Sequence, residues 1–155
     1  NEGATEIPIT HEKMTRFWIT LQGGVDFVLK NFTRMKGGEI FVPKIPSIWI
    51  KDLATAMAPG VKQRIVGIRP GEKLDEIMCP KDDSHLTVEF DNHYTIMPTI
   101  TFNDKNPNYL ENAIGETGTS VEQGFEYNSG NNAHFFTIEE IKSLNNKVFA
   151  EENIL

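Results

Sequence analysis

Residues 16–35 read RFWITLQGGVDFVLKNFTRM, and this stretch decides the fold class. Phe17-Trp18-Ile19 is rich in residue types that favour strands, and Thr20 is a good N-cap for a helix that begins at Leu21. From there, apolar residues recur at steps of three and four and share one helical face: Leu21, Val25, Val28, Leu29, Phe32 and Met35. Gly37-Gly38 ends the helix. A strand that leads into an amphipathic helix is typical of an α/β protein.

Short strands and helices continue on both sides of this stretch. We expect further strands at 7–10, 39–42, 45–50, 64–68, 86–90, 94–96 and 125–127. Further helices are expected at 51–58, at 73–78 and after Thr137, which forms a capping box with Glu140. The strand at 64–68 is expected to be buried. The residues of the helix at 51–58 that are expected to face inward are Leu53, Ala54, Met57 and Ala58. This order predicts a mixed α/β fold without a complete doubly wound sheet.

The charge and the cysteine content limit the function classes. A net charge of −7 and a pI near 5.1 argue against binding to nucleic acid or to an anionic membrane, because both need a basic surface. The single cysteine, Cys79, excludes an internal disulfide and fits a reducing compartment. No apolar run approaches the roughly 20 residues of a membrane span. We therefore expect a cytoplasmic protein, and because the chain begins with Asn1 we expect a piece of a longer polypeptide.

No catalytic motif is recognisable. Neither G-x-G-x-x-G nor a P-loop occurs, so the chain carries no recognisable dinucleotide or phosphate loop. The four histidines are isolated and are expected at the surface or in turns: His11, His85, His93 and His134. Cys79 is expected to be a small buried hydrophobe, because no helix start or basic neighbour is visible to activate it. The sequence predicts no catalytic residue and no metal site.

Two arginines at the edges of apolar runs are the candidates for ligand binding. Arg16 precedes Phe17-Trp18-Ile19, and Arg69 follows 65–68 in the segment Arg69-Pro70-Gly71-Glu72. A guanidinium matches the geometry of phosphate oxygens, so two of them at converging loops would hold a diphosphate. Glu72 would either orient Arg69 or accept a sugar hydroxyl. The alternative is that both arginines are solvated surface charges.

Several segments, in this order, resemble the inverting UDP-N-acetylglucosamine 4,6-dehydratases of the extended short-chain dehydrogenase/reductase superfamily. These segments are Pro8–Thr10, Met14–Thr20, Gly38–Ser47, Gly67–Leu74, Ser84–Leu86, Pro98–Ile100, Phe125–Tyr127 and Asn131-Asn132. The resemblance implies the C-terminal, substrate-binding portion of such an enzyme, with the Rossmann domain largely absent. It also implies that NADP is bound by the missing N-terminal half, which in this family carries the Gly-rich turn and the catalytic residues.

The resemblance further implies an activity. These enzymes are NADP-dependent lyases that form a 4-keto-6-deoxy sugar nucleotide for pseudaminic acid or other surface glycans, with inversion at C5. UDP-N-acetylglucosamine is then the partner, the full-length protein is a homo-oligomer, and this chain alone is inactive. The implied parts are a substrate-binding lobe at 1–101, a polar surface loop at 102–124, and a C-terminal turn and helix at 125–155 that close on the substrate.

The resemblance also assigns substrate-binding residues. Arg16 and Arg69 match positions that contact the nucleotide and its diphosphate, Glu72 is a further candidate, and Asn131 or Asn132 matches a turn that closes on the substrate. The chain departs from the family pattern at three other positions, which are His11, Asp75 and Ala133. Ala133 leaves the choice between the two asparagines open. The alternative function is a stand-alone, non-catalytic module that binds a nucleotide sugar or serves in assembly.

Overall fold

The computed structural model describes residues 5–100 and 107–152. Their contacts group the chain into two units, each built from separated segments. Unit 1 contains residues 1–18, 45–76 and 129–155, and unit 2 contains residues 19–44 and 77–128. The division into 1–101, 102–124 and 125–155 stays a prediction, and residues 102–106 of its loop lie outside the described residues.

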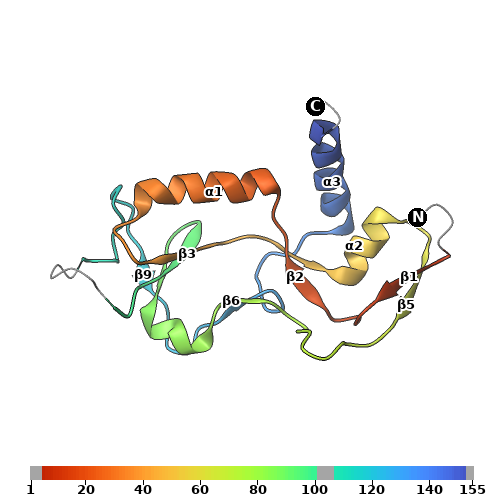
Figure 1. Cartoon of the computed structure of the whole chain (residues 1–155), viewed down its shortest axis with the longest axis horizontal. Coiled ribbons are helices and arrows are strands. Elements are labelled where there is room, and N and C mark those ends of the chain that lie inside the picture. Colours follow the sequence, from red (N-terminus) through yellow and green to blue (C-terminus); the bar gives the residue numbers. More distant parts are fainter. Residues whose placement is uncertain (1–4, 101–106, 153–155) are drawn as a thin grey trace. The chain divides into compact units, whose positions relative to one another are not determined.

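Unit 1 combines two strand pairs with two helices (Figure 1). Its elements are β1 (Glu6–Ile9), β2 (Thr15–Phe17), β4 (Ser47–Trp49), α2 (Ile50–Met57), β5 (Lys62–Ile65) and α3 (Ile138–Glu152). β1 pairs with β5 in parallel, and β2 pairs with β4 in antiparallel fashion. α2 packs against α3. Its buried apolar side chains are Ile9, Met14, Ile48, Ala54 and Ile141.

Unit 2 is built on a four-stranded antiparallel sheet, with α1 running beside β3 (Figure 1). Its elements are α1 (Leu21–Arg34), β3 (Ile40–Pro43), β6 (Ile77–Cys79), the 3₁₀ helix η1 (Lys81–Leu86), β7 (Thr87–Glu89), β8 (His93–Ile96), β9 (Thr119–Ser120) and β10 (Tyr127–Asn128). The sheet order is β3-β8-β7-β9, and β6 pairs with β10 separately. Its buried apolar side chains are Val42, Cys79, Val88, Phe90, Tyr94, Ile96 and Tyr127. The predicted mixed α/β class is confirmed.

The helix predicted from Leu21 is confirmed, and so is its Thr20 cap, but it ends at Arg34 with Met35 as its C-cap, two residues before the predicted stop at Gly37-Gly38. The Thr20 side chain accepts a hydrogen bond from the Gly23 amide, which satisfies one of the free N–H groups of the first turn. The helix ends before Gly37 and Gly38, whose φ values of +116° and +87° favour glycine.

The apolar stripe of α1 is exposed. Leu21 is 87% exposed and Phe32 66% exposed, whereas the buried side chains of the helix are the polar Asn31 and Arg34. The periodicity therefore predicted the helix itself, while the face that the rest of unit 2 covers carries Asn31, Arg34 and the half-buried Phe27.

Three expectations about local structure are wrong. The segment 73–78 forms no helix: bends at Leu74 and Asp75 lead into β6, because Arg16 takes up the carbonyls of Lys73 and Leu74 that a helix would use. The strand expected at 64–68 is β5, but it is not buried, since Ile65 is 52% exposed. Met57 is exposed at the end of α2 rather than facing inward.

Other local predictions are confirmed. β7 and β8 lie where strands were predicted, at 86–90 and 94–96, and they form an antiparallel hairpin across Asp91 and Asn92. The capping box at the start of α3 is present, since the Glu140 carboxylate accepts from the Thr137 amide and the Thr137 hydroxyl accepts from the Glu140 amide. No helix of the described part is long and apolar enough to cross a bilayer.

Candidate functional site

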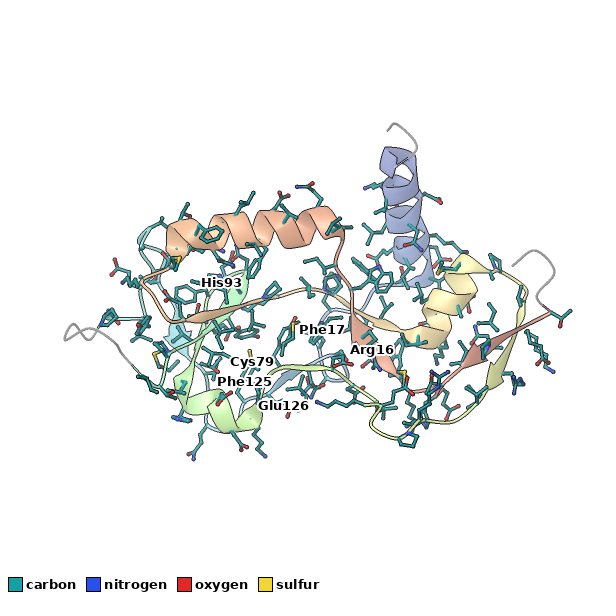
Figure 2. The ribbon with its side chains drawn as sticks, in the orientation of Figure 1. Arg16, Phe17, Cys79, His93, Phe125 and Glu126 are labelled. Carbon is teal, nitrogen blue, oxygen red and sulfur yellow. The ribbon has the colours of Figure 1, made fainter. Side chains whose placement is uncertain are left out.

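Arg16 lies on β2 of unit 1 (Figure 2), and its guanidinium binds backbone carbonyls. Nη1 donates to the carbonyls of Thr15 at 2.6 Å and Leu74 at 3.1 Å, and Nη2 donates to the carbonyl of Lys73 at 3.0 Å. Nε lies 3.3 Å from Glu76 Oε1, and the Arg16 side chain is 23% exposed. Arg16 therefore fixes residues 73–76, the segment that follows the Arg69 turn, and keeps part of its surface accessible.

Arg69 begins a turn that Glu72 closes. The Glu72 amide donates to the Arg69 carbonyl at 3.0 Å, and the Arg69 amide donates to Glu72 Oε2 at 3.1 Å. Gly71, inside the turn, has φ of +82°, where a side chain would be strained. Arg69 is exposed, and within residues 5–100 and 107–152 its guanidinium forms no ion pair. The turn holds the backbone of Arg69 and leaves its donors available to a ligand.

The two asparagines of the C-terminal turn have different surroundings. Asn132 Nδ2 donates to the Ile45 carbonyl at 2.8 Å and to Ser47 Oγ at 3.0 Å, so this side chain secures the start of β4. Asn131 is exposed. Which of the two contacts a substrate stays a prediction.

Hydrogen bonds join the three segments that carry the predicted site residues. The Thr15 amide donates to the Leu74 carbonyl at 3.1 Å, and the Ser129 amide donates to the Glu76 carbonyl at 2.8 Å. The Thr15 hydroxyl contacts both Asp75 and Ser129. Thr15, Asp75 and Ser129 were not singled out as site residues from the sequence, because isolated hydroxyls 60 and 114 positions from their partners leave no spacing signal.

Unit 2 contains a buried polar cluster around Arg34, which is only 1% exposed. Its Nε and Nη2 bind both carboxylate oxygens of Glu116, at 2.8 and 3.1 Å, and Nη2 also donates to Asn92 Oδ1 at 3.0 Å. The hydrogen bond from Arg34 lowers the pKa of Glu116. Because the Arg34 guanidinium is already paired with Glu116 and Asn92, we infer that Arg34 stabilises unit 2.

His93 corrects the expectation of a surface or turn histidine, because it is fully buried on β8, on the side of α1 (Figure 2). Its ring stacks on Phe90 with centroids 4.6 Å apart, and Phe27 of α1 meets it edge-on. Burial and, next, the charge of Arg34 lower the pKa of His93 from 6.5 to about 4. A histidine that stays neutral in an aromatic cluster is a core residue.

Cys79 agrees with its predicted role. It is fully buried on β6, and burial raises the pKa of its thiol to about 12, with the charge of Asp83 acting in the same direction. A thiol of that pKa is not an active nucleophile. In the described part of the chain, no group of three or more metal-ligating side chains is placed to hold an ion.

Comparison with known proteins identifies the relatives of this chain. It is 60% identical over 132 residues to a UDP-N-acetylglucosamine 4,6-dehydratase (inverting) of Campylobacter jejuni serotype O:2, covering 85% of this chain and 40% of that protein. It is 52% identical over 145 residues to an enzyme of the same name from C. jejuni serotype O:23/36, covering 94% of this chain and 43% of that protein. The predicted resemblance is confirmed, and the chain spans less than half the length of these relatives.

A solved structure and a family model agree with this placement. The X-ray structure of Pen from Bacillus thuringiensis matches 96% of this chain and 43% of its own, with a TM-score of 0.72 and 24% identity, which supports the fold. The family model described as polysaccharide biosynthesis protein matches residues 1–98. The chain belongs to this polysaccharide biosynthesis protein family.

Proposed function

We propose that this chain is the UDP-sugar-binding part of a C5-inverting UDP-N-acetylglucosamine 4,6-dehydratase. The observation that carries the proposal is the identity of 60% and 52% to two proteins of that name, over 85% and 94% of the chain. The product would be a 4-keto-6-deoxy sugar nucleotide for pseudaminic acid or another surface glycan. The complete enzyme would be a cytoplasmic lyase and a homo-oligomer.

The geometry of unit 1 supports a role in substrate binding. Arg69 presents a planar fork of donors from a turn that Glu72 and Gly71 hold in shape, and such a fork matches diphosphate oxygens. Arg16 secures the chain directly after this turn and keeps 23% of its side chain exposed to a ligand. By holding the nucleotide end of the substrate, these residues would position the sugar for chemistry that groups outside this chain carry out. Asn131 or Asn132 would close over the sugar.

The residues present do not fit a nicotinamide cofactor. The sequence has no Gly-rich turn between a strand and a helix, which is the element that meets a dinucleotide pyrophosphate. We therefore propose that NADP, which oxidises and then reduces the sugar in this family, is held by the part of the relatives that this chain does not span. This chain would contribute binding and orientation, and by itself no turnover.

The test uses the complete gene product that contains this chain, with UDP-N-acetylglucosamine as substrate and NADP as cofactor. Arg69→Ala should weaken UDP-sugar binding by about 2 to 3 kcal/mol, as expected for a charge-assisted hydrogen-bonding group. Arg16→Lys should also be harmful, because an ammonium does not reproduce the planar fork. Arg64→Ala is the matched control: this exposed arginine on β5 forms an ion pair only with half-buried Glu6 among the described residues, so its change should shift binding by less than about 0.5 kcal/mol.

The outcomes separate the candidate functions. Formation of a 4-keto-6-deoxy product that depends on Arg69 supports the dehydratase. Tight binding of UDP-N-acetylglucosamine without any product supports the stand-alone binding module instead. Unchanged KM and kcat in Arg69→Ala contradict the role of Arg69.

A further inference from the structure

Two hydroxyl groups in unit 1 are fully buried at the point where three segments meet. Thr15 on β2 and Ser129 after β10 are both 0% exposed, and their hydroxyl oxygens lie 2.7 Å apart. Thr15 Oγ1 is also 2.7 Å from Asp75 Oδ1. Ser129 Oγ is 2.9 Å from the Glu76 amide nitrogen. Buried hydroxyls need partners, and these groups supply them to one another.

The direction of each hydrogen bond follows from the number of hydrogens. A carboxylate only accepts, so the single hydroxyl hydrogen of Thr15 goes to Asp75. Thr15 Oγ1 then accepts from the Ser129 hydroxyl, whose oxygen in turn accepts from the Glu76 amide. The bonds run in one direction, from Glu76 through Ser129 and Thr15 to the carboxylate of Asp75. Such a chain of bonds is cooperative and ends on a charge.

Gly130 closes the cluster on the side of the C-terminal turn. A Cβ atom on Gly130 would lie 2.6 Å from Asp75 Cγ and 2.7 Å from both carboxylate oxygens. Its φ does not lie in the left-handed region, so what a side chain would disturb here is the Asp75 carboxylate, which would have to move away. The turn that carries Asn131 and Asn132 thus lies directly against Asp75.

We propose that Thr15, Ser129 and Asp75 are positioning residues for the nucleotide-sugar site. Asp75 and Glu76 follow the Arg69 turn by a few residues, Ser129 precedes the asparagine turn, and Thr15 adjoins Arg16. The hydrogen-bonded cluster holds these three segments in one arrangement before a substrate arrives. The inference rests on the proposed function, and it assigns to these three side chains no contact with substrate.

The arrangement would act through preorganisation. Binding residues on separate segments give affinity only when their geometry is fixed in advance, because ordering them during binding opposes association. Thr15→Val keeps the shape of the side chain and removes both the donor to Asp75 and the acceptor for Ser129. Thr15→Ser keeps the hydroxyl. The pair therefore separates the hydrogen bonds from the packing.

The experiment compares Thr15→Val with Thr15→Ser in the complete gene product. We expect Thr15→Val to raise the KM for UDP-N-acetylglucosamine and the Kd for UDP, measured by calorimetry, by about tenfold, which corresponds to about 1.4 kcal/mol. We expect kcat to stay within about twofold, and Thr15→Ser to stay within about twofold in every constant, since it keeps the hydroxyl bonds. Thr33→Val, which removes an exposed hydroxyl from α1, is the matched control and should resemble the wild type.

Each outcome decides the proposal. Wild-type constants in a folded Thr15→Val protein, or equal losses in the valine and serine variants, overturn it. If Thr15→Val does not fold, Ser129→Ala replaces it and is judged by the same constants. If the wild type itself binds neither UDP nor UDP-N-acetylglucosamine, the proposed function fails. Amide exchange at Glu76 and Ser129 then tests the cluster alone: it should be faster in Thr15→Val than in Thr15→Ser, and equal rates overturn the link between the segments.

Discussion

The buried imidazole of His93 should make the stability of unit 2 depend on pH. Nδ1 lies 2.9 Å from Asn92 Oδ1, which also accepts from Arg34, so Nδ1 carries the ring hydrogen as a donor. Nε2 is buried and has no hydrogen-bond partner in the described part of the chain. Protonation of Nε2 would bury a second positive charge beside Arg34 in an aromatic cluster. Burial and, next, this charge lower the pKa of His93 from 6.5 to about 4.

The sign and size of the effect follow from this pKa. The folded protein has the lower pKa, so as the pH falls below about 6.5 the unfolded chain takes up a proton before the folded chain does. The free energy of unfolding should therefore decrease between pH 6.5 and about 4. One pKa unit corresponds to about 1.4 kcal/mol, so the full decrease is about 3 kcal/mol.

Urea unfolding, followed by circular dichroism at several pH values, measures this decrease. His93→Phe keeps an aromatic ring against Phe90 and cannot take up a proton, so its unfolding free energy should change less between pH 6.5 and 4.5 than that of the wild type. His85→Gln is the matched control, because His85 is exposed and its loss should leave the wild-type slope. Carboxylates titrate in all three proteins, so the comparison isolates His93. Parallel curves for the wild type and His93→Phe would refute the reasoning.

Three further predictions concern other parts of the chain. Cys79 should fail to react with a thiol reagent at pH 8 in the folded protein and react fully in urea, because burial raises its pKa to about 12. Equal rates of labelling in the folded and the urea-unfolded protein would contradict this. The isolated chain should self-associate through the apolar face of α1, and replacing Leu21 and Phe32 with Gln should lower its mass in light scattering towards that of a monomer. Gly130→Ala should destabilise the protein by about 1 to 3 kcal/mol through overpacking against Asp75, and Asp75→Ala should remove most of this penalty in a double-mutant cycle; additive losses would exclude the contact.

Features with local causes were predictable from the sequence. The helix after Thr20 follows from a capping hydroxyl and a period of 3.6 within fifteen residues, and the α3 capping box needs only Thr137 and Glu140. The hairpin of β7 and β8 needs two short apolar runs around a turn. In each case the interacting groups lie within a few residues of one another, so pattern and structure report the same interaction.

Features with long-range causes were not predictable. The apolar residues at 73–78 favoured a helix, but Arg16, 58 positions before Leu74, binds the carbonyls that the helix needed. His93 looked like a turn residue because, although Phe90 is close in sequence, its other aromatic neighbours Phe27 and Phe41 come from distant parts of the chain. The sequence identified Arg16 and Arg69 as candidates. It did not reveal the hydroxyl cluster, because the partners of Thr15 lie 60 and 114 positions away.

The two faces of α1 show what a hydrophobic period does and does not predict. An apolar stripe such as the one that begins with Leu21 usually indicates the covered face of a helix. Among the described residues, however, the buried side chains of α1 are Asn31 and Arg34. Arg34 is buried because Glu116 and Asn92 satisfy its charge and its donors, which no periodicity records. An apolar stripe left open beside a polar face that is already satisfied points to a second covering element. In a polypeptide as long as the C. jejuni relatives, of which this chain spans 40% and 43%, we expect the remaining residues to cover it.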